Sequence, residues 1–178
     1  MKIIGIDEVG RGSLAGPMAA VAVLIDDNFR VEGVTDSKKI TRKKREMLFA
    51  EIQKSAICIG IGWVSARELD EVSLTEANRL VMQRALNEVD QEYDRLCIDG
   101  NYAYIKNAEC IVKGDIKEQS IAAGSIIAKV LRDRYMIAMS KIYPGYGFET
   151  NVGYGTKKHL EAIVSLGKTK IHRKSFLH

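Results

Sequence analysis

The sequence contains few of the residues that mark secreted, disordered or membrane-embedded chains. Its 178 residues include only two prolines and three cysteines, and aromatic residues make up 7%. A hydrophobic content of 46% with 28% charged residues excludes a disordered chain. Cys58, Cys97 and Cys110 have neither paired nor zinc-ligand spacing, and each lies in an apolar stretch. We therefore expect buried free thiols in a reducing compartment.

Long hydrophobic runs are also missing. No segment approaches the roughly 18–20 apolar residues that a membrane span needs. Asp7 and Glu8 interrupt the first apolar run, so we expect no signal peptide. These absences predict a cytoplasmic protein without a membrane partner. The length is typical of one domain, and with no repeats or linker we expect residues 1–178 to form a single domain.

The positive charge is modest but clustered. The formal net charge is +4, which is compatible with a polyanionic partner without requiring one. Each basic cluster can equally be a solvated surface or a phosphate-binding one. The first cluster comprises Lys38, Lys39, Arg42, Lys43, Lys44 and Arg45, and the second comprises Lys168, Lys170, Arg173 and Lys174.

The apolar patterning predicts an α/β protein. Strands are expected over residues 2–7, 18–25, 56–64, 95–99 and 109–112. Helices are expected over 41–54, with Thr41 as N-cap, and over 75–88, 118–141 and 156–166. Three early strands followed by two that alternate with helices indicate a mixed five-stranded sheet flanked by helices.

Carboxylates stand where predicted strands end. Asp7 and Glu8 end the first strand, Asp99 ends the fourth, and Asp115 lies just beyond the fifth. If these strands are neighbours, the acids converge on one edge of the sheet. Carboxylates without histidine or cysteine suit Mg²⁺ or Mn²⁺, and two such ions can promote phosphodiester cleavage. A helix cap or solvated turn is the alternative for any single acid, but three strand ends together favour the metal site.

The residues after Asp7 carry two further expectations. Neighbours on a strand point to opposite faces, so we expect a bulge or turn at Glu8, which Gly10 permits. In Gly10-Arg11-Gly12 the glycines tolerate positive φ and let the backbone approach a ligand closely. Its N–H groups can hold phosphate or sugar hydroxyls. A tight turn with a surface arginine is the alternative.

Several further blocks follow one another along the chain. Together with the motifs above they are residues 5–12 with 14–17, 36–39, 98–100, 113–115, 125–130, 132–134, 153–156 with His159, and His172-Arg173 with Ser175-Phe176. In this order they resemble the ribonuclease HII family over nearly the whole sequence.

The resemblance implies a ribonuclease H-like fold and a Mg²⁺- or Mn²⁺-dependent endonuclease. Its implied substrates are the RNA strand of RNA/DNA hybrids and single ribonucleotides embedded in duplex DNA. Cleavage on the 5′ side of a ribonucleotide would leave a 3′-hydroxyl and a 5′-phosphate.

Matched motif by motif, the resemblance implies catalytic, metal-binding carboxylates at Asp7, Glu8, Asp99 and Asp115. It selects Asp115 over Asp133, a choice that the residues alone leave open. Asp133 then has a structural or supporting role.

The resemblance also implies substrate contacts. Backbone of Gly10, Arg11 and Gly12 would contact the ribonucleotide's 2′-hydroxyl, and Tyr154 would contact the nucleotide on the DNA side of the junction. Ser125 and Lys129 lie four apart on one helix face, and together with Lys38 and Lys39 they are candidates for a phosphate track. For Lys129, a lysine packed along a polar helix face is the alternative.

Three residues depart from the family pattern, which has proline, a basic residue and alanine where Ser13, Val152 and Gly124 stand. We expect Ser13 to loosen its loop and Val152 to remove one phosphate contact. Nothing substantial follows His178, so we expect no appended C-terminal helical domain, and we expect a monomer.

Three alternatives can be distinguished from this interpretation. Ribonuclease HIII would carry an N-terminal substrate-binding domain and a glutamate as fourth acid, whereas here the first strand starts at residue 2 and the fourth acid is Asp115. A non-catalytic hybrid-binding module would lack one of the acids. A transposase-like DNA strand transferase would lack the 10–12 turn and the Tyr154 block.

Overall fold

The computed structural model describes residues 1–35 and 37–177, and within them the strands form one mixed sheet. The strands are β1 (Ile3–Val9), β2 (Met18–Ile25), β3 (Cys58–Val64), β4 (Arg95–Asp99) and β5 (Glu109–Ile111). Their order is β3-β2-β1-β4-β5. β2 is antiparallel to β1 and β3, whereas β4 is parallel to β1 and β5. The predicted mixed five-stranded α/β fold is confirmed.

The four predicted helices are present, and four short helical segments accompany them. The predicted ones are α1 (Arg42–Ser55), α3 (Leu74–Asn87), α5 (Gln119–Ile142) and α7 (Lys157–Leu166). Thr41 caps α1 as expected, because its side chain accepts from the backbone N–H of Lys44. The others are α2 (Ala66–Glu71), α4 (Gly114–Lys117), α6 (Phe148–Asn151) and the 3₁₀ helix η1 (Lys174–Phe176).

Of these short segments, only α2 carries a clear sequence signal. Ser65 and Glu68 form a reciprocal capping box at its start, a pattern that can be recognised in the sequence. The helices α4 and α6 have four residues each, which is too short for an apolar repeat to show.

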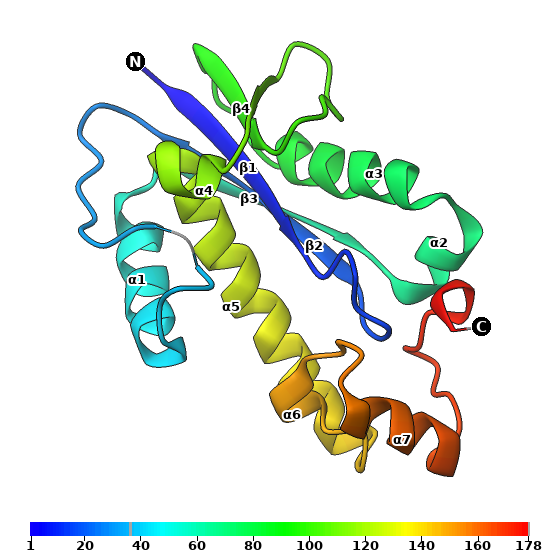
Figure 1. The fold of residues 1–178 in the computed structure, drawn as a ribbon. Helices are drawn as coiled ribbons and strands as arrows, with labels where there is room; N and C mark the ends of the chain where they lie inside the picture. The colour runs from blue at the N-terminus through cyan, green and yellow to red at the C-terminus, as the bar shows by residue number, and fades with distance from the viewer. Residues whose placement is uncertain (36, 178) are drawn as a thin grey trace.

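Helices cover both faces of the sheet: α3 lies on one face, and α1 and α5 lie on the other (Figure 1). On the α3 side, Ile4 and Ile6 of β1 pack with Val81 and Met82 in one apolar cluster. On the other side, apolar residues of β2, α1 and α5 form a second cluster.

Glycines bring α5 very close to β1 and β2. A Cβ on Gly5 would lie 2.2 Å from the backbone nitrogen of Ile121, and one on Gly124 would lie 2.9 Å from the carbonyl oxygen of Val21. Glycine at position 124, in place of the family's alanine, therefore serves this close packing. The helix consequently passes directly beneath the end of β1 that carries Asp7.

A third apolar cluster joins the end of α5 to α6 and α7. The chain from α7 then runs back to the α2 side of the sheet, where η1 lies (Figure 1). Among the helices described, none is long and apolar enough to span a bilayer.

Candidate metal centre and nucleic-acid site

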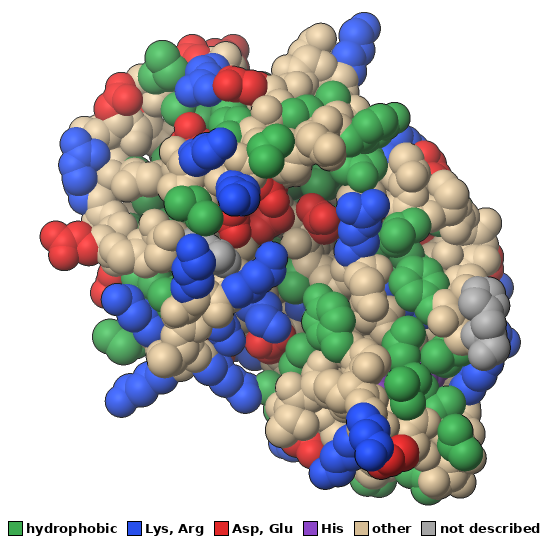
Figure 2. Space-filling model, viewed as in Figure 1, with side chains coloured by type: hydrophobic (Ala, Val, Ile, Leu, Met, Phe, Trp, Pro, Cys, Tyr) green, Lys and Arg blue, Asp and Glu red, His purple; other side chains and the backbone are tan. Residues whose placement is uncertain are grey.

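Three adjacent strands end at one edge of the sheet, and each brings an acid there. β1, β4 and β5 are parallel neighbours. The register pairs Ile6 with Ile98, so the next residues, Asp7 and Asp99, lie side by side. Asp115 lies in the first turn of α4, soon after β5 ends. Figure 2 shows acidic side chains near the middle of this face, with Lys and Arg side chains around them.

The expected bulge at Glu8 is wrong, because β1 stays regular beyond it. Its pairing with β2 runs without interruption through Asp7↔Val21 and Glu8↔Ala20. Asp7 therefore points toward α5 and Glu8 toward α3. The pairing of β1 with β4 ends at Ile6 and Ile98. Beyond that pair, both carboxylates can turn toward Asp99, the last residue of β4.

Burial and crowding work against the negative charge of these acids. The pKa of Asp7 is raised well above its ordinary value, first by burial, then by Glu8 and, less strongly, by Asp99; the nearby Ser125 hydroxyl and the Glu8 N–H oppose this. The pKa of Glu8 is raised by burial and by Asp99, against the effects of its own N–H, Arg11 and Asn78. A cation at this edge would relieve the repulsion.

A left-handed turn holds Asp115 near Asp99. Lys113 has φ 57°, and the Gly114 N–H donates to Asp99 Oδ1 at 2.7 Å. A Cβ on Gly114 would lie 2.6 Å from Ile121 Cδ1 and 3.3 Å from Asp99 Oδ1. The absence of a side chain at Gly114 thus favours this close approach, and the Asp115 side chain lies buried in the first turn of α4.

The donor set matches a hard divalent cation, since carboxylate oxygens are the ligands that Mg²⁺ and Mn²⁺ take. Across residues 1–35 and 37–177, no three Asp, Glu, His or Cys side chains are already gathered in ligating geometry. Mutual repulsion keeps like charges apart, so we expect the acids to draw together around a cation.

Buried arginines fix the 10–12 turn, and one of them is Arg173. Its guanidinium is fully buried and donates to the carbonyl oxygens of Gly10, Arg11 and Gly16 at 2.6, 2.9 and 2.9 Å. From its place in the C-terminal basic cluster, Arg173 was expected to be either a solvated residue or a phosphate contact. Because it is buried and bonded to the loop, it is neither. Arg11 and Gly12 themselves are exposed.

Arg132 secures the segment that follows. It is fully buried, and its guanidinium donates to four oxygens: Ser13 Oγ and the carbonyls of Ala15, Pro17 and Val152. Ser13 Oγ also donates to the Gly10 carbonyl at 3.0 Å. The expectation that Ser13 loosens this loop is therefore wrong. The sequence analysis did not predict that these two arginines bind the loop. The available signal was the glycine-rich loop itself, whose many backbone carbonyls need hydrogen-bond donors.

Tyr154 lies against the same arginine. Its ring centroid is 5.5 Å from the Arg132 guanidinium carbon, and 37% of the residue is exposed. Gly153 has φ 91°, and a Cβ there would lie 2.2 Å from the carbonyl oxygen of Ala15. Arg132 thus connects the Tyr154 ring to the loop that follows the 10–12 turn.

The predicted phosphate-track residues divide into two groups. Lys38 and Lys39 are exposed, while Asp36 of the same block lies outside the described residues. Ser125 is buried beside Asp7 and exchanges a 2.9 Å hydrogen bond with Ser37. Lys129 Nζ donates to Asp133 Oδ1 at 2.8 Å. Asp133 therefore has the supporting role that the sequence suggested.

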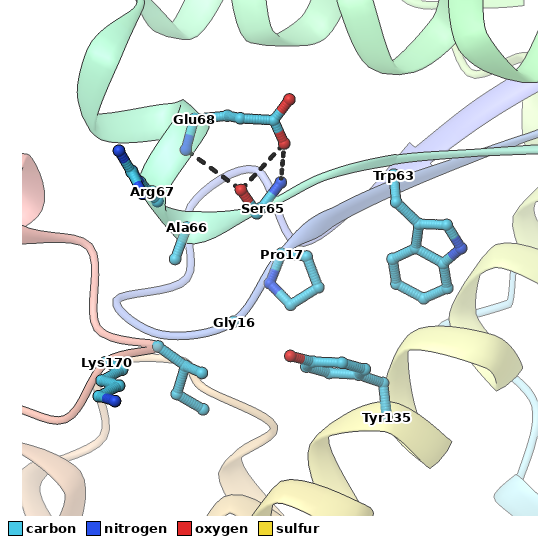
Figure 3. A pocket seen from close by; sticks show the side chains of 10 residues that line it. Gly16, Pro17, Trp63, Ser65, Ala66, Arg67, Glu68, Tyr135 and Lys170 are labelled. Carbon is cyan, nitrogen blue, oxygen red and sulfur yellow. Dashed lines mark hydrogen bonds between the residues drawn. The ribbon is translucent and has the colours of Figure 1, made fainter.

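A pocket lined in part by aromatic and other apolar side chains lies elsewhere. A cavity of about 490 Å³ opens where β3, α2, α5 and the C-terminal segment meet, and none of the four carboxylates lines it. Figure 3 shows the rings of Trp63 and Tyr135 turned toward it, with Pro17 nearby. The candidate site is therefore the open, charged edge of the sheet.

The sheet order, the helices on both faces and the acids at adjacent strand ends define the ribonuclease H-like class. The family model described as Ribonuclease HII matches residues 4–178. The chain belongs to the ribonuclease HII family. It is accordingly a metal-dependent ribonuclease H, an endonuclease that hydrolyses the RNA of RNA/DNA hybrids.

Individual relatives agree with this membership. The chain is 48% identical over 175 residues to ribonuclease HII of Bacillus subtilis, covering 98% of this chain and 69% of the relative. The crystal structure of ribonuclease H2 from Pyrococcus horikoshii is 29% identical with a TM-score of 0.83, covering 98% and 93% of the two chains. Ribonuclease HII from Archaeoglobus fulgidus, solved in complex with PCNA, is 26% identical with a TM-score of 0.78, covering 98% and 94%.

Proposed function

We propose that Asp7, Glu8, Asp99 and Asp115 bind Mg²⁺ or Mn²⁺ and form the catalytic centre. The observation that carries this is the crowding of buried acids at adjacent strand ends, which raises the pKa of both Asp7 and Glu8. Divalent cations held there supply charge stabilisation and an activated water for phosphodiester hydrolysis. Cleavage on the 5′ side of a ribonucleotide leaves a 3′-hydroxyl and a 5′-phosphate.

The chain's own groups orient these acids. Ser125 lies beside Asp7 and is itself anchored by Ser37, so we assign Ser125 to positioning instead of direct phosphate contact. The Gly114 N–H donates to one Asp99 oxygen and so orients that carboxylate. Supports of this kind fix the direction of a ligand before the cation arrives.

The exposed 10–12 turn is the proposed reader of the 2′-hydroxyl, the group that separates RNA from DNA. Arg173 occupies the carbonyls of Gly10 and Arg11. The solvent side of the turn is therefore left with N–H groups, including that of Gly12, to meet the sugar. Tyr154 is the proposed contact on the DNA side, because its partly exposed ring lies near the same loop.

Lys38 and Lys39 are the proposed phosphate contacts. Both are exposed and follow Ser37, which is bonded to Ser125 at the edge of the site. Lys129 is kept as a phosphate candidate on the same helix face as Ser125, and its ammonium also pairs with Asp133.

We further propose that residues 1–178 act as one catalytic domain, monomeric and cytoplasmic. Its substrates are long hybrids and duplex DNA with embedded ribonucleotides, in ribonucleotide removal and primer degradation during replication and repair. The family membership and the single five-stranded sheet support these assignments.

The test uses end-labelled DNA duplexes that contain one ribonucleotide, incubated with Mg²⁺ or with Mn²⁺. We expect a single cut at the 5′ side of the ribonucleotide, with a 3′-hydroxyl on the upstream fragment. The matched all-DNA duplex should stay intact. Cleavage of the all-DNA duplex would instead support a DNA strand transferase, and a cut leaving a 2′,3′-cyclic phosphate would exclude the proposed water attack.

A further inference from the structure

Asn78 is a buried amide that the packing of α3 does not explain. It is 1% exposed and lies on the helix face that also carries Ala77, Val81 and Met82. Neither Nδ2 nor Oδ1 has a hydrogen-bond partner within the described part of the chain. Burying an amide without partners costs free energy, and native proteins do so rarely. An apolar residue would serve the core better at this position.

The strand register places Asn78 at the Glu8 end of β1. Ile4, Ile6 and Glu8 alternate along one face of β1, and the two isoleucines pack against α3. Glu8 pairs with Ala20, and Ala20 with Gly62. A Cβ on Gly62 would meet the backbone of α3 at the Val81 oxygen, 2.1 Å away. Asn78 lies one turn before that point, toward the end of the sheet where Glu8 stands.

The amide also lies close enough to Glu8 for a hydrogen-bonding interaction to affect that carboxyl. It lowers the pKa of that carboxyl, against the larger opposing effect of burial. It does so without reaching the geometry of a full hydrogen bond. A small movement of the carboxylate or of the amide would complete the contact.

We propose that Asn78 is a positioning residue for Glu8, whose carboxylate accepts from Asn78 Nδ2 when a divalent cation binds. The inference rests on the proposed assignment of Glu8 to the metal site. This role explains why a buried amide without a partner is present: it can donate a hydrogen bond to the metal ligand Glu8, which lies on the face of β1 that Ser125 does not reach. Asp7 has its support from α5, and Glu8 receives its own from α3.

The test compares Asn78→Val with Asn78→Thr, two side chains of one shape that differ by a hydroxyl. Mn²⁺ affinity is measured by calorimetry without nucleic acid, and thermal unfolding is measured without metal. Outer supports of metal ligands are typically worth 10–100-fold in affinity, so Asn78→Val should bind Mn²⁺ at least about 10-fold more weakly. Asn78→Thr should recover part of that loss. Without metal, the valine variant should be as stable as wild type or more so.

Met82→Leu, one turn along the same buried face, is the control for repacking and should leave Mn²⁺ affinity unchanged. Wild-type affinity in Asn78→Val would overturn the proposal. Equal losses in the valine and threonine variants, or a loss matched by Met82→Leu, would assign the effect to shape and overturn it as well. If Glu8→Gln also leaves Mn²⁺ affinity unchanged, the metal site itself is wrongly assigned; if Glu8→Gln weakens binding and Asn78→Val does not, only the role of Asn78 fails.

Discussion

At the residue scale, Tyr154 presents an aromatic face to solvent while its backbone is held in place. Its carbonyl pairs with His159 Nδ1 at 2.8 Å, and its ring lies over Arg132. A ring packed against a deoxyribose would crowd a 2′-hydroxyl or leave it unpaired, at a cost of roughly 1–3 kcal/mol. This is how one side chain can distinguish the two sides of an RNA–DNA junction.

Tyr154→Ala should therefore slow cleavage of a single embedded ribonucleotide, and its preference for this substrate over one with a second ribonucleotide on the DNA side should fall by about 5- to 150-fold, the equivalent of that free energy. Single-turnover rates on the embedded substrate provide the measurement. Tyr154→Phe keeps the ring and should stay near the wild-type rate. Unfolding and Mn²⁺ affinity should barely change in either variant. An alanine variant that folds and cuts at the wild-type rate would reduce Tyr154 to a packing residue.

The proposed phosphate contacts of Lys38 and Lys39 predict how strongly binding depends on salt. Lysines that contact phosphates displace counterions, so the logarithm of affinity falls linearly with the logarithm of salt concentration. Replacing both with glutamine should reduce that slope by about two units, one for each lysine. Binding to a hybrid is measured in Ca²⁺, across a series of salt concentrations. Replacing Lys2, just before β1, and Lys54, near the end of α1, with glutamine is the matched double control. If the slope is unchanged in the variant that lacks Lys38 and Lys39, those two lysines belong to the solvated surface and do not contact phosphates.

At the element scale, a histidine pair joins α7 to the C-terminal segment. The Thr169 N–H donates to His172 Nδ1, so the proton of neutral His172 is on Nε2. That proton points to His159 Nε2, 3.1 Å away, and His159 in turn donates from Nδ1 to the Tyr154 carbonyl. The chain of donors has one consistent direction only when both imidazoles are neutral.

This pair predicts a loss of stability in acid. Burial, together with His159 and Lys168, lowers the pKa of His172 from 6.5 to about 4. Between these values the unfolded chain binds the proton and the folded chain does not, so the free energy of unfolding falls as pH falls from about 6.5 toward 4. The loss is at most about 3.4 kcal/mol. Urea unfolding at pH 7, 6 and 5 checks it.

His172→Gln, which has a donor and an acceptor but does not titrate, should flatten this pH dependence. The carboxylates Asp7 and Glu8 act in the opposite direction, because their raised pKa values favour folding as they become protonated. The difference between wild type and variant isolates the histidine contribution. Equal slopes in the two proteins would contradict it.

The elements also show where sequence reasoning succeeds and fails. Asp7 and Asp99 could be picked out as candidates because a buried strand that ends in a charge is a local pattern, whereas the choice of Asp115 over Asp133 needed the family resemblance. The direction of the Glu8 side chain could not be predicted, because it depends on where the pairing of β1 with β4 stops, and that pairing ends at Ile6 and Ile98. Arg173 was missed because it contacts Gly10 from 163 positions away along the chain, and no local pattern records that.

At the scale of the whole molecule, one end of the sheet combines every proposed function. Three parallel strands supply the acids, and two buried arginines from α5 and the C-terminal segment secure the loop beside them. Exposed cations surround the acidic centre (Figure 2). We propose that the negative charge of these acids holds the divalent cations that promote hydrolysis of RNA at a ribonucleotide.

Asp99→Asn tests that claim most directly, because it keeps the side-chain volume and removes one charge. Glu109→Gln is the matched control: Glu109 is an exposed acid at the opposite end of β5, paired with Arg95. Cleavage of the embedded ribonucleotide in saturating Mg²⁺ should fall at least about 100-fold in Asp99→Asn, as loss of several kcal/mol of charge stabilisation requires. Stability without metal should hold or rise, since Asp99 raises the pKa of Asp7 and Glu8. Glu109→Gln should cut normally. Near wild-type turnover by a folded Asp99→Asn protein would contradict the account.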